Sequence, residues 1–388
     1  LSNNLGSYII YIKHLKGAIY MIGDMQTWTP NIAGLIEHAR EIHPKTEIIS
    51  RMVSGAVHRS NYEEVCIRSR KLASALEKDG IKNGDVVATL ALNTYRHLEM
   101  YYGISGMGAI CHTLNFRLHP EQAVYIINHA DDKIIFCEVP FIPIMEGLKD
   151  QLPCVEKYII LCDKADMPET GLKNAVSYEE YINNGDEDYV WPAMEDDAAC
   201  GLCYTSGTTG NPKGVLYSHK SNILHAQASL VGMPIGPDES ILMVVPLFHV
   251  LAWGIPYYGP MNGSKLVMPG MQMEGEPLFD LIDKEKVTLA FGVPTIWMGL
   301  LTYCRDNNKI LTSVRNTIIG GSALSLPTLQ EFDEVHDVNV IHAWGMTEMS
   351  PLGTINVPTP EMDNMSKDEK YAIQLKQGKP IYGVELKV

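Results

Sequence analysis

Apolar strand patterns alternate with amphipathic helical patterns along two long stretches of the chain. In the first stretch, residues 85–162, a nearly continuous apolar run at 85–92 is followed by further helices and shorter apolar runs. The helical pattern at 120–130 begins with Pro120, which suits the first turn of a helix. The alternation resumes at residue 218 and continues to about residue 335. Such alternation predicts parallel, doubly wound α/β sheets with both faces covered by helices.

Individual elements follow from apolar runs and from helix start signals. Ser60 to Glu63 has the form of a capping box, and the apolar residues after it recur on one helical face until Gly80. Ser218 predicts the cap of a second helix. Strands are predicted at 85–92, 109–113, 133–137, 157–162, 199–203, 215–217, 241–245, 265–268, 289–291, 317–319 and, as a strand-like run, 384–388; further helices are predicted at 95–107, 120–130, 140–150, 218–230, 278–285, 294–304 and 326–335.

One segment interrupts this alternation and divides the chain. Residues 163–197 are acidic and rich in turn residues, with only a short helical pattern at 178–183, and this composition predicts a linker. The linker separates a first α/β subdomain at 21–162 from a second at 198–388. Residues 1–20 are an N-terminal arm of undefined structure, because charged residues interrupt its apolar parts. No run in the chain reaches the roughly 18 apolar residues of a membrane span.

Charge and cysteine usage narrow the class of protein. The net charge of −15 opposes binding to nucleic acid or to an anionic membrane surface. The eight cysteines are scattered, and Cys200 and Cys203 form the only close pair. This pair could be half of a metal site or a redox pair, but no second pair follows, and residues three apart on a strand point to opposite faces. A reduced, cytoplasmic protein is therefore expected.

The stretch Tyr204–Gly214 has the composition of a phosphate-binding loop. Its glycines bring backbone N–H groups close to an anion, its hydroxyl side chains add donors, and Lys213 supplies a positive charge. A Walker A loop is excluded, because that motif needs Ser or Thr directly after the lysine and Gly214 stands there. A plain surface turn is the alternative, but short apolar strands flank the loop on both sides.

Residues 204–214 resemble the phosphate-loop signature of the acyl-adenylate-forming superfamily, which contains acyl-CoA synthetases, luciferases and the adenylation domains of peptide synthetases. Two later stretches, 320–323 and 343–348, match motifs of the same superfamily in the same order. The residues around them, 246–254 and 341–351, are most similar to medium- and long-chain fatty acyl-CoA synthetases. The resemblance covers nearly the whole chain after the N-terminal arm. It implies an α/β fold, the large N-terminal domain of an adenylate-forming enzyme, with two doubly wound α/β subdomains whose sheets pack together.

The resemblance also implies a reaction, that of an ATP-dependent acyl-CoA synthetase. A medium- or long-chain fatty acid would react with Mg·ATP to give acyl-AMP and pyrophosphate, and CoA would then take the acyl group and release AMP. Two alternatives stay open: a ligase for a short acid such as 3-methylthiopropionate, and a nucleotide- or acyl-binding protein without catalysis. The implied partners are a small-molecule carboxylic acid, ATP and CoA, with no nucleic acid and no membrane span, and a homodimer is allowed.

Adenylation brings a carboxylate to the α-phosphate of ATP, so the site has to neutralise negative charge. Magnesium takes few protein oxygens, and a single carboxylate beside the phosphate loop suffices to hold it. The resemblance gives this role to Glu348, with the Thr205 hydroxyl as a second ligand, and implies that Thr347 donates to the α-phosphate. The plain alternative is that Thr347 and Glu348 only start a helix after Gly345.

The resemblance implies roles for further residues. His249 would be an electrostatic or gating group rather than a base, because a carboxylic acid is already ionised near neutral pH. Trp253 resembles a gate to the acyl tunnel, with core packing as an equal alternative, and Trp344 is either a core aromatic or a plate for adenine. The catalytic residues are thus expected to be Lys213, His249, Thr347 and Glu348; the metal ligands Thr205 and Glu348; the acyl-binding residues His249, Val250, Trp253 and Gly321; and the ATP-binding residues Thr205, Ser206, Gly207, Thr208, Thr209, Gly210, Lys213, Gly321, Ser322, Ala323, His342, Ala343, Trp344, Gly345, Met346 and Thr347.

Several residues of the superfamily have no counterpart in the chain. Its ribose-binding aspartate, the following arginine, the hinge and the C-terminal lysine would come directly after residues 378–388. The sequence therefore predicts a truncated N-terminal domain, with the small C-terminal domain missing.

Overall fold

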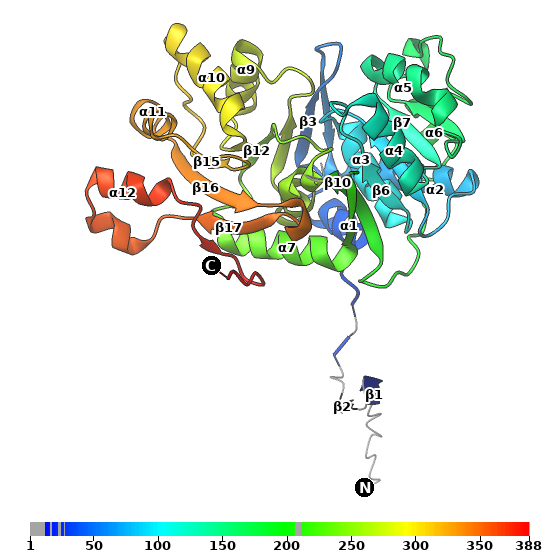
Figure 1. The fold of residues 1–388 in the computed structure, drawn as a ribbon, viewed down its shortest axis with the longest axis horizontal. Helices are drawn as coiled ribbons and strands as arrows, with labels where there is room; N and C mark the ends of the chain where they lie inside the picture. Colours follow the sequence, from blue (N-terminus) through cyan, green and yellow to red (C-terminus); the bar gives the residue numbers. More distant parts are fainter. Residues whose placement is uncertain (1–11, 16–17, 22–24, 27, 206–210, 388) are drawn as a thin grey trace.

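The computed structural model describes residues 12–387 of the chain, apart from 16–17, 22–24, 27 and 206–210. The body is mixed α/β with two large sheets, and a hairpin of β1 (Ile12–Leu15) and β2 (Ala18–Met21) precedes it (Figure 1). The centre of the predicted phosphate loop and much of the predicted arm at 1–20 lie outside the described residues.

The first sheet has seven strands in the order β11-β10-β6-β5-β7-β8-β9. All neighbours are parallel except β10 and β11, which pair antiparallel on either side of the predicted phosphate loop. Strands such as β7 are buried at every position, as expected for a sheet with both faces covered. The strands are β5 (Val86–Leu90), β6 (Ile110–Thr113), β7 (Ile134–Cys137), β8 (Lys157–Ile160), β9 (Val176–Ser177), β10 (Ala199–Thr205) and β11 (Lys213–Ser218).

The second sheet has nine strands in the order β18-β17-β16-β15-β14-β12-β13-β3-β4. Its centre, from β16 to β3, is parallel, and its two ends are antiparallel. The strands are β3 (Glu47–Arg51), β4 (Val57–Asn61), β12 (Ser240–Met243), β13 (Lys265–Met268), β14 (Leu289–Gly292), β15 (Asn316–Ile319), β16 (Asn339–Gly345), β17 (Leu352–Asn356) and β18 (Lys379–Pro380).

The two sheets exchange strands across the linker that the sequence predicts at 163–197. β3 and β4 come early in the chain but belong to the nine-stranded sheet, whereas β10 and β11 follow the linker and complete the seven-stranded sheet. Sheet membership therefore does not change at that linker. The exchange places the flanks of the predicted phosphate loop on one sheet and the two later motifs on the other.

Helices cover both sheets and fill the space between them (Figure 1). One hydrophobic cluster joins residues of both sheets, for example Cys111 and Cys203 of the first with Ile241 and Phe291 of the second. α3 is buried along its whole length. The helices are α1 (Ile32–Ile42), α2 (Tyr62–Lys78), α3 (Tyr95–Gly106), α4 (Pro120–Ala130), α5 (Ile142–Leu148), α6 (Tyr178–Ile182), α7 (His219–Gly232), α8 (Ile255–Asn262), α9 (Gly275–Glu285), α10 (Pro294–Asp306), α11 (Leu326–His336) and α12 (Lys367–Gln374), with short 3₁₀ turns at η1 (Val139–Phe141), η2 (Lys149–Gln151), η3 (Lys164–Asp166), η4 (Val250–Gly254), η5 (Thr347–Met349) and η6 (Pro360–Asn364).

Most predicted elements are confirmed, and the differences have local causes. The cap of α2 is Asn61, the last residue of β4, whose side chain accepts from the N–H of Glu64 at 2.9 Å. The Ser60 hydroxyl, one residue earlier, donates to the Ile48 carbonyl instead. The strand-like run at 384–388 is wrong for residues 384–387, which lie in no strand. α1, α8 and the β3–β4 hairpin are not among the predicted elements.

Candidate functional site

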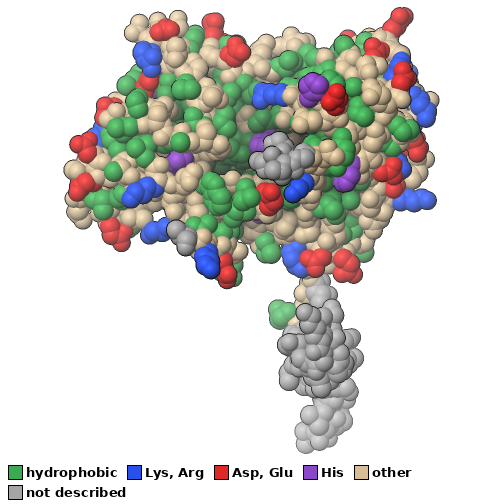
Figure 2. Space-filling model, in the orientation of Figure 1, with side chains coloured by type: hydrophobic (Ala, Val, Ile, Leu, Met, Phe, Trp, Pro, Cys, Tyr) green, Lys and Arg blue, Asp and Glu red, His purple; other side chains and the backbone are tan. Residues whose placement is uncertain are grey.

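A cavity of about 350 Å³ opens where the carboxyl ends of parallel strands meet. Phe291 of β14, Ile318 of β15 and Ala343 of β16 line it, together with Val245, which follows β12. Ligands of open α/β sheets bind at this edge. Figure 2 shows hydrophobic side chains gathered in a hollow near the middle of one face of the body.

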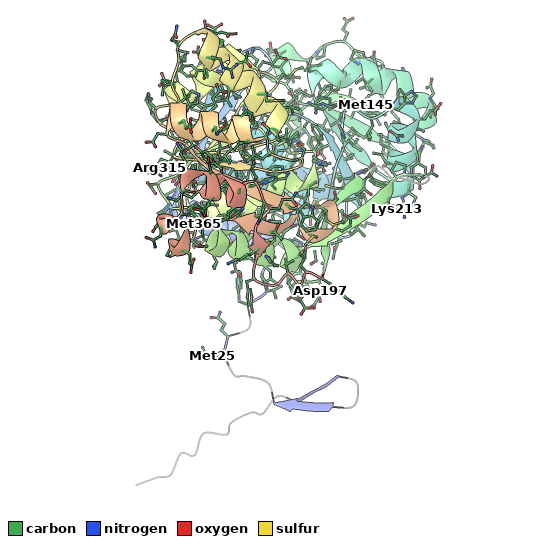
Figure 3. All side chains as sticks on the ribbon, turned by 60° about the vertical axis from the view of Figure 1, so that its left-hand side comes forward. Met25, Met145, Asp197, Lys213, Arg315 and Met365 are labelled. Carbon is green, nitrogen blue, oxygen red and sulfur yellow. The ribbon has the colours of Figure 1, made fainter. Side chains whose placement is uncertain are left out.

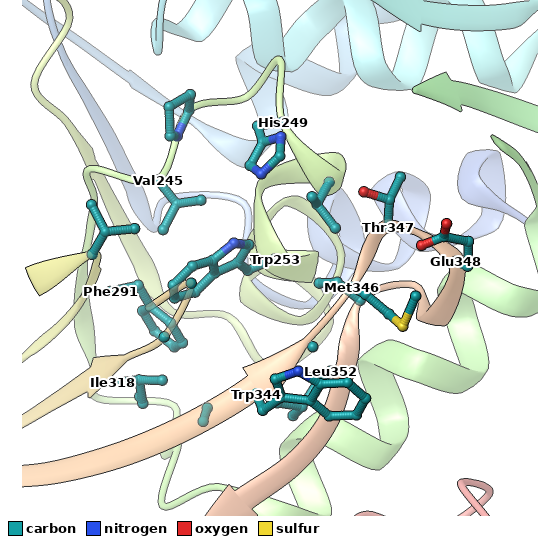
Figure 4. Close-up of a pocket in the computed structure, with 18 of the residues that line it drawn as sticks. Val245, His249, Trp253, Phe291, Ile318, Trp344, Met346, Thr347, Glu348 and Leu352 are labelled. Carbon is teal, nitrogen blue, oxygen red and sulfur yellow. The ribbon is translucent and has the colours of Figure 1, made fainter. Parts of the chain in front are cut away.

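The cavity brings together segments that are far apart in the sequence. Figure 4 shows Val245, Trp253, Phe291 and Ile318 on one side of it, and Thr347 and Glu348 on the other. The predicted site residues that line the cavity are His249, Val250, Trp253, Gly321, Ala343, Trp344, Gly345, Met346, Thr347 and Glu348.

Polar side chains from the first half of the chain hold the segment that leads to His249. The Asn93 amide donates to the carbonyls of Met243 and Val245, each at 2.7 Å, and accepts from the N–H of Leu247 at 2.8 Å. Asn93 is buried, and each of its three bonds reaches a backbone group at least 150 residues away. The conformation before His249 is therefore set by a side chain from the end of β5.

The turn after His249 is left-handed. Val250, Leu251, Ala252 and Trp253 have φ values between 42° and 56°, and Gly254 has a φ of 81°. Positive φ costs each non-glycine residue about 1–3 kcal/mol, so packing has to compensate. Leu251 and Ala252 are buried, and a Cβ on Gly201 would lie only 3.3 Å from a Leu251 methyl group. The turn directs Trp253 into the cavity (Figure 4).

Two glycines of the second motif make room for Trp253. A Cβ on Gly320 would lie 3.2 Å from the Trp253 ring and 3.0 Å from the Ala343 carbonyl oxygen. Gly321 has a φ of +81°, which disfavours any other residue there. The indole therefore lines the cavity and is only partly buried, and it also packs against the hydrophobic core. This position is compatible with both predicted roles, a gate and a core aromatic.

The third motif is a tight turn between β16 and β17. A Cβ on Gly345 would lie 2.2 Å from the Pro351 carbonyl oxygen, and one on Gly353 would lie 2.7 Å from the Trp344 ring. Trp344 thus packs against the backbone of β17 and also lines the cavity. Both proposed roles of this ring, packing and an aromatic plate, agree with its position.

The flanks of the predicted phosphate loop do not line the cavity. Thr205 ends β10 and pairs with Lys213, which begins β11 (Figure 3). The Thr205 hydroxyl donates to the Lys213 carbonyl at 3.4 Å, and Tyr204 lies 2.6 Å from a ring nitrogen of His129. The predicted residues Ser206, Gly207, Thr208, Thr209 and Gly210 lie outside the described residues.

Three other predicted ATP-binding residues do not line the cavity. Ser322 and Ala323 follow Gly321 beyond its wall. His342 is buried and is not among the residues that line the cavity. Its Nδ1 donates to the Leu375 carbonyl at 2.9 Å, just after α12. Any nucleotide contact of His342 must therefore come from its backbone.

Two histidines near the site stay neutral. His249 is accessible from the cavity, and burial among the surrounding residues lowers its pKa. Burial lowers the pKa of His225 to about 4, and its Nε2 accepts from the N–H of Leu352 at 3.1 Å. A neutral His249 neither attracts nor repels an anion as a full charge would. It therefore suits a group that positions the substrate better than a positively charged donor.

The oxygen atoms at the cavity suit a cation such as Mg²⁺ that takes most of its ligands from a bound phosphate and from water. Among the described residues, no group of three or more His, Cys, Asp and Glu could hold a metal ion. Glu348 supplies one exposed carboxylate at the cavity, and Mg²⁺ binds in this way with phosphate and water oxygens as its other ligands. Cys200 and Cys203 are buried free thiols, and burial raises the pKa of Cys200 to about 12. The CxxC pair is therefore structural.

Sequence reasoning missed most of the apolar wall. The lining residues without a predicted role are Met233, Val245, Pro246, Phe291, Val293, Ile318, Pro351 and Leu352, whereas Gly320 belongs to the second motif. Several of these residues end a parallel strand or follow one directly. That position is a signal, since adjacent parallel strands present their carboxyl ends to the same site.

Among the described residues, no helix has the length and apolar character needed to cross a membrane.

Comparisons with known proteins agree with this geometry. A family model described as "AMP-binding enzyme" matches residues 36–388. Among curated proteins, the chain is 44% identical over 370 residues to the medium-chain-fatty-acid–CoA ligase of Ectopseudomonas oleovorans, covering 95% of the chain and 68% of that protein. It is also 44% identical over 370 residues to the 3-methylmercaptopropionyl-CoA ligase of Ruegeria lacuscaerulensis, with 95% and 69% covered.

A solved structure carries the same fold. The anthranilate CoA ligase AuaEII in complex with anthranoyl-AMP superposes with a TM-score of 0.82 at 22% identity, covering 94% of the chain and 67% of that structure. The expected fold, the large N-terminal domain of adenylate-forming enzymes, is thereby confirmed. The chain belongs to the AMP-binding enzyme family, and within it to the AMP-forming acyl-CoA ligases.

Proposed function

We propose that this chain activates a medium- or long-chain fatty acid as its acyl-adenylate and passes the acyl group to CoA. One observation carries the proposal: a single cavity joins an apolar wall, which includes Val245, Phe291 and Ile318, to a polar end with Thr347 and Glu348. An acyl-adenylate has the same division between an alkyl chain and a phosphate. The described lining contains no Lys or Arg to pair with a second charge on the acid.

The residues divide the work of adenylation between them. Lys213 and the loop before it would hold the outer phosphates, and Thr347 would donate to the α-phosphate. Mg²⁺, when bound through Glu348 and Thr205, supplies charge that lets two anions approach each other. No base is needed, because the acid is already ionised at neutral pH.

His249 and Trp253 would act on the acid. His249 stands between the apolar wall and the polar end, where a neutral imidazole can orient the carboxylate by a hydrogen bond. Trp253 lies against Gly320 and Gly321 and would admit the alkyl chain by changing rotamer. Trp344 would supply an aromatic face to the adenine.

A short sulfur-containing acid is the second candidate. The 3-methylmercaptopropionyl-CoA ligase is as similar to the chain as the medium-chain ligase, at 44% identity. The cavity of about 350 Å³ is also near the lower end of the range for ligand sites. With Trp253 in its lining, the space would suit a short acid as it stands, and a longer one only after the indole moves.

One experiment separates these candidates. ATP–pyrophosphate exchange would be measured with straight-chain acids from two to sixteen carbons and with 3-methylthiopropionate, followed by thioester formation with CoA. We expect kcat/KM to rise with chain length and to reach its maximum at medium length or above. A maximum at 3-methylthiopropionate would establish the second candidate, and exchange with no acid would refute the proposal.

A further inference from the structure

Tyr217 links the two sheets directly beside the site. It lies on β11, four residues after Lys213, and its side chain is 3% exposed. Its hydroxyl donates to the backbone carbonyl of Thr347 at 2.6 Å. β11 belongs to the seven-stranded sheet and Thr347 follows β16 of the nine-stranded sheet. A single buried hydrogen bond therefore connects the strand after the phosphate loop to the turn that carries Thr347 and Glu348.

The packing around Tyr217 leaves its ring little freedom. Gly201 stands opposite Tyr217 on β10, and a Cβ there would lie 3.8 Å from the Tyr217 ring and 3.3 Å from Leu251. The glycine thus gives space to Tyr217 and to the left-handed turn before Trp253. Burial raises the pKa of Tyr217, and the Cys203 thiol and the Glu348 carboxylate raise it further. The hydroxyl is therefore a permanent donor at neutral pH.

The turn that receives this bond has few other restraints. The N–H of Met346 donates to the Pro351 carbonyl and that of Met349 to the Met346 carbonyl, each at 3.0 Å, so both bonds are internal to the turn. The Leu352 N–H is held from outside by His225. The Thr347 carbonyl belongs to the peptide that joins Thr347 to Glu348. Fixing that peptide fixes the direction of both side chains.

We propose that Tyr217 is a positioning residue for adenylation, whose hydroxyl holds the Thr347 carbonyl and so aims Thr347 and Glu348 at the phosphates. This inference rests on the function proposed above. β11 carries the hydroxyl, so this strand and the Thr347–Glu348 turn keep a fixed spacing. If Thr347 or Glu348 pointed in a slightly different direction, the reaction rate would fall, because a misplacement of about 1 Å can cost about 100-fold in rate.

The test is Tyr217→Phe, with Tyr62→Phe as a matched control. Tyr62 is also buried, and its hydroxyl donates to the Ser264 carbonyl at 2.7 Å, away from the cavity. Both variants lose one tyrosine–carbonyl bond and keep the ring, so their melting temperatures should fall by similar amounts. In the ligand-free protein, amide hydrogen exchange of residues 345–352 should become about 3- to 10-fold faster in Tyr217→Phe only, which corresponds to the loss of one hydrogen bond.

Catalysis gives the second measurement. Tyr217→Phe should lower kcat for pyrophosphate exchange about 10-fold or more and leave KM for the acid unchanged, because the acyl wall is untouched. Tyr62→Phe should retain the wild-type kcat. Unchanged exchange rates at 345–352 together with an unchanged kcat would overturn the positioning role. A wild-type protein that activates no acid would refute the proposed function instead, and the hydrogen-exchange comparison would still judge the contact itself.

Discussion

Trp253 offers the sharpest test of the acyl site, because the structure separates its contacts from those of the nucleotide. The indole lies against Gly320 and Gly321, on the same side of the cavity as Phe291 and Ile318. Trp253→Ala keeps the Cβ and removes the ring from the path of the alkyl chain. We expect the preferred acid to become longer by two or more methylenes.

The magnitude follows from the apolar surface that a longer chain can bury. Each added methylene in contact contributes about 0.8 kcal/mol, which is a factor of about 4 in kcat/KM. For two acids that differ by two methylenes, the ratio of kcat/KM should therefore shift about 15-fold. Acids too short to reach the opened space lose the indole contact and should react more slowly than with the wild type.

The assay is pyrophosphate exchange across straight-chain acids at saturating ATP, with Trp344→Ala as the control aromatic. Trp344 packs on Gly353 at the other end of the cavity, so its loss should raise KM for ATP and preserve the order of the acids. An unchanged acid profile in Trp253→Ala, combined with weaker ATP binding, would refute the gate and make Trp253 a core aromatic.

Three further predictions concern charge, backbone and pH. Glu348→Gln should leave the melting temperature unchanged and reduce pyrophosphate exchange by about two orders of magnitude, the scale of one lost charge-stabilising group; near wild-type exchange would remove Glu348 from the site. Gly321→Ala should cost about 1–3 kcal/mol of unfolding free energy in denaturant titrations, because its φ is +81° and its Cβ would meet Val293 at 3.1 Å. Burial lowers the pKa of His219 to about 4 from 6.5, so its stabilising contribution is complete above pH 6.5 and is lost as the pH falls through 4. In His219→Asn, the side-chain oxygen can still accept from the Ile32 N–H. Between pH 6.5 and 4, the unfolding free energy of this variant should therefore fall by up to about 1.4 kcal/mol less per pH unit than that of the wild type. The same pH dependence of the unfolding free energy in both proteins would contradict this.

The sequence predicts local elements well where the signal is local. Pro120 starts α4 and Ser218 caps α7 as expected, and β13 has the predicted bounds. The cap of α2 shifts by one residue, because Ser60 and Asn61 are both good cap residues and the Ser60 hydroxyl is already bonded to the Ile48 carbonyl. Local patterns cannot distinguish such neighbours.

Sheet membership is not a local property, and the sequence does not predict it. The pattern of β10 identifies a strand but not its neighbours, and the β3–β4 hairpin is not predicted, so the sequence suggests only a linear division at 163–197. Long-range packing decides the outcome: β3 joins β13, more than 200 residues later, and β10 joins β6, about 90 residues earlier.

The sequence likewise identifies the motif residues of the site but not the apolar residues of the cavity wall. Glycines, a tryptophan and a Thr-Glu pair in fixed order are unusual enough to identify Gly321, Trp344 and Glu348. Phe291 and Ile318 resemble any buried strand residue, and only their place at the strand ends brings them to the cavity. The left-handed turn at 250–253 has no sequence signal at all, because its Val, Leu, Ala and Trp are typical of ordinary helices or strands.

The exchange of strands gives a reason for the polar contacts that cross between the sheets. The strands that flank the predicted phosphate loop and most of the cavity wall belong to different sheets, so the relative position of the sheets determines how Lys213 lies relative to Glu348. Hydrophobic contacts alone resist sliding poorly, since they are not directional. The bonds from Asn93 to Val245, from Thr113 to Phe248 and from Tyr217 to Thr347 are directional, and each ends on the backbone of a segment that lines or borders the cavity. Register between the sheets is thus fixed at the site itself, where an error would cost the most catalysis.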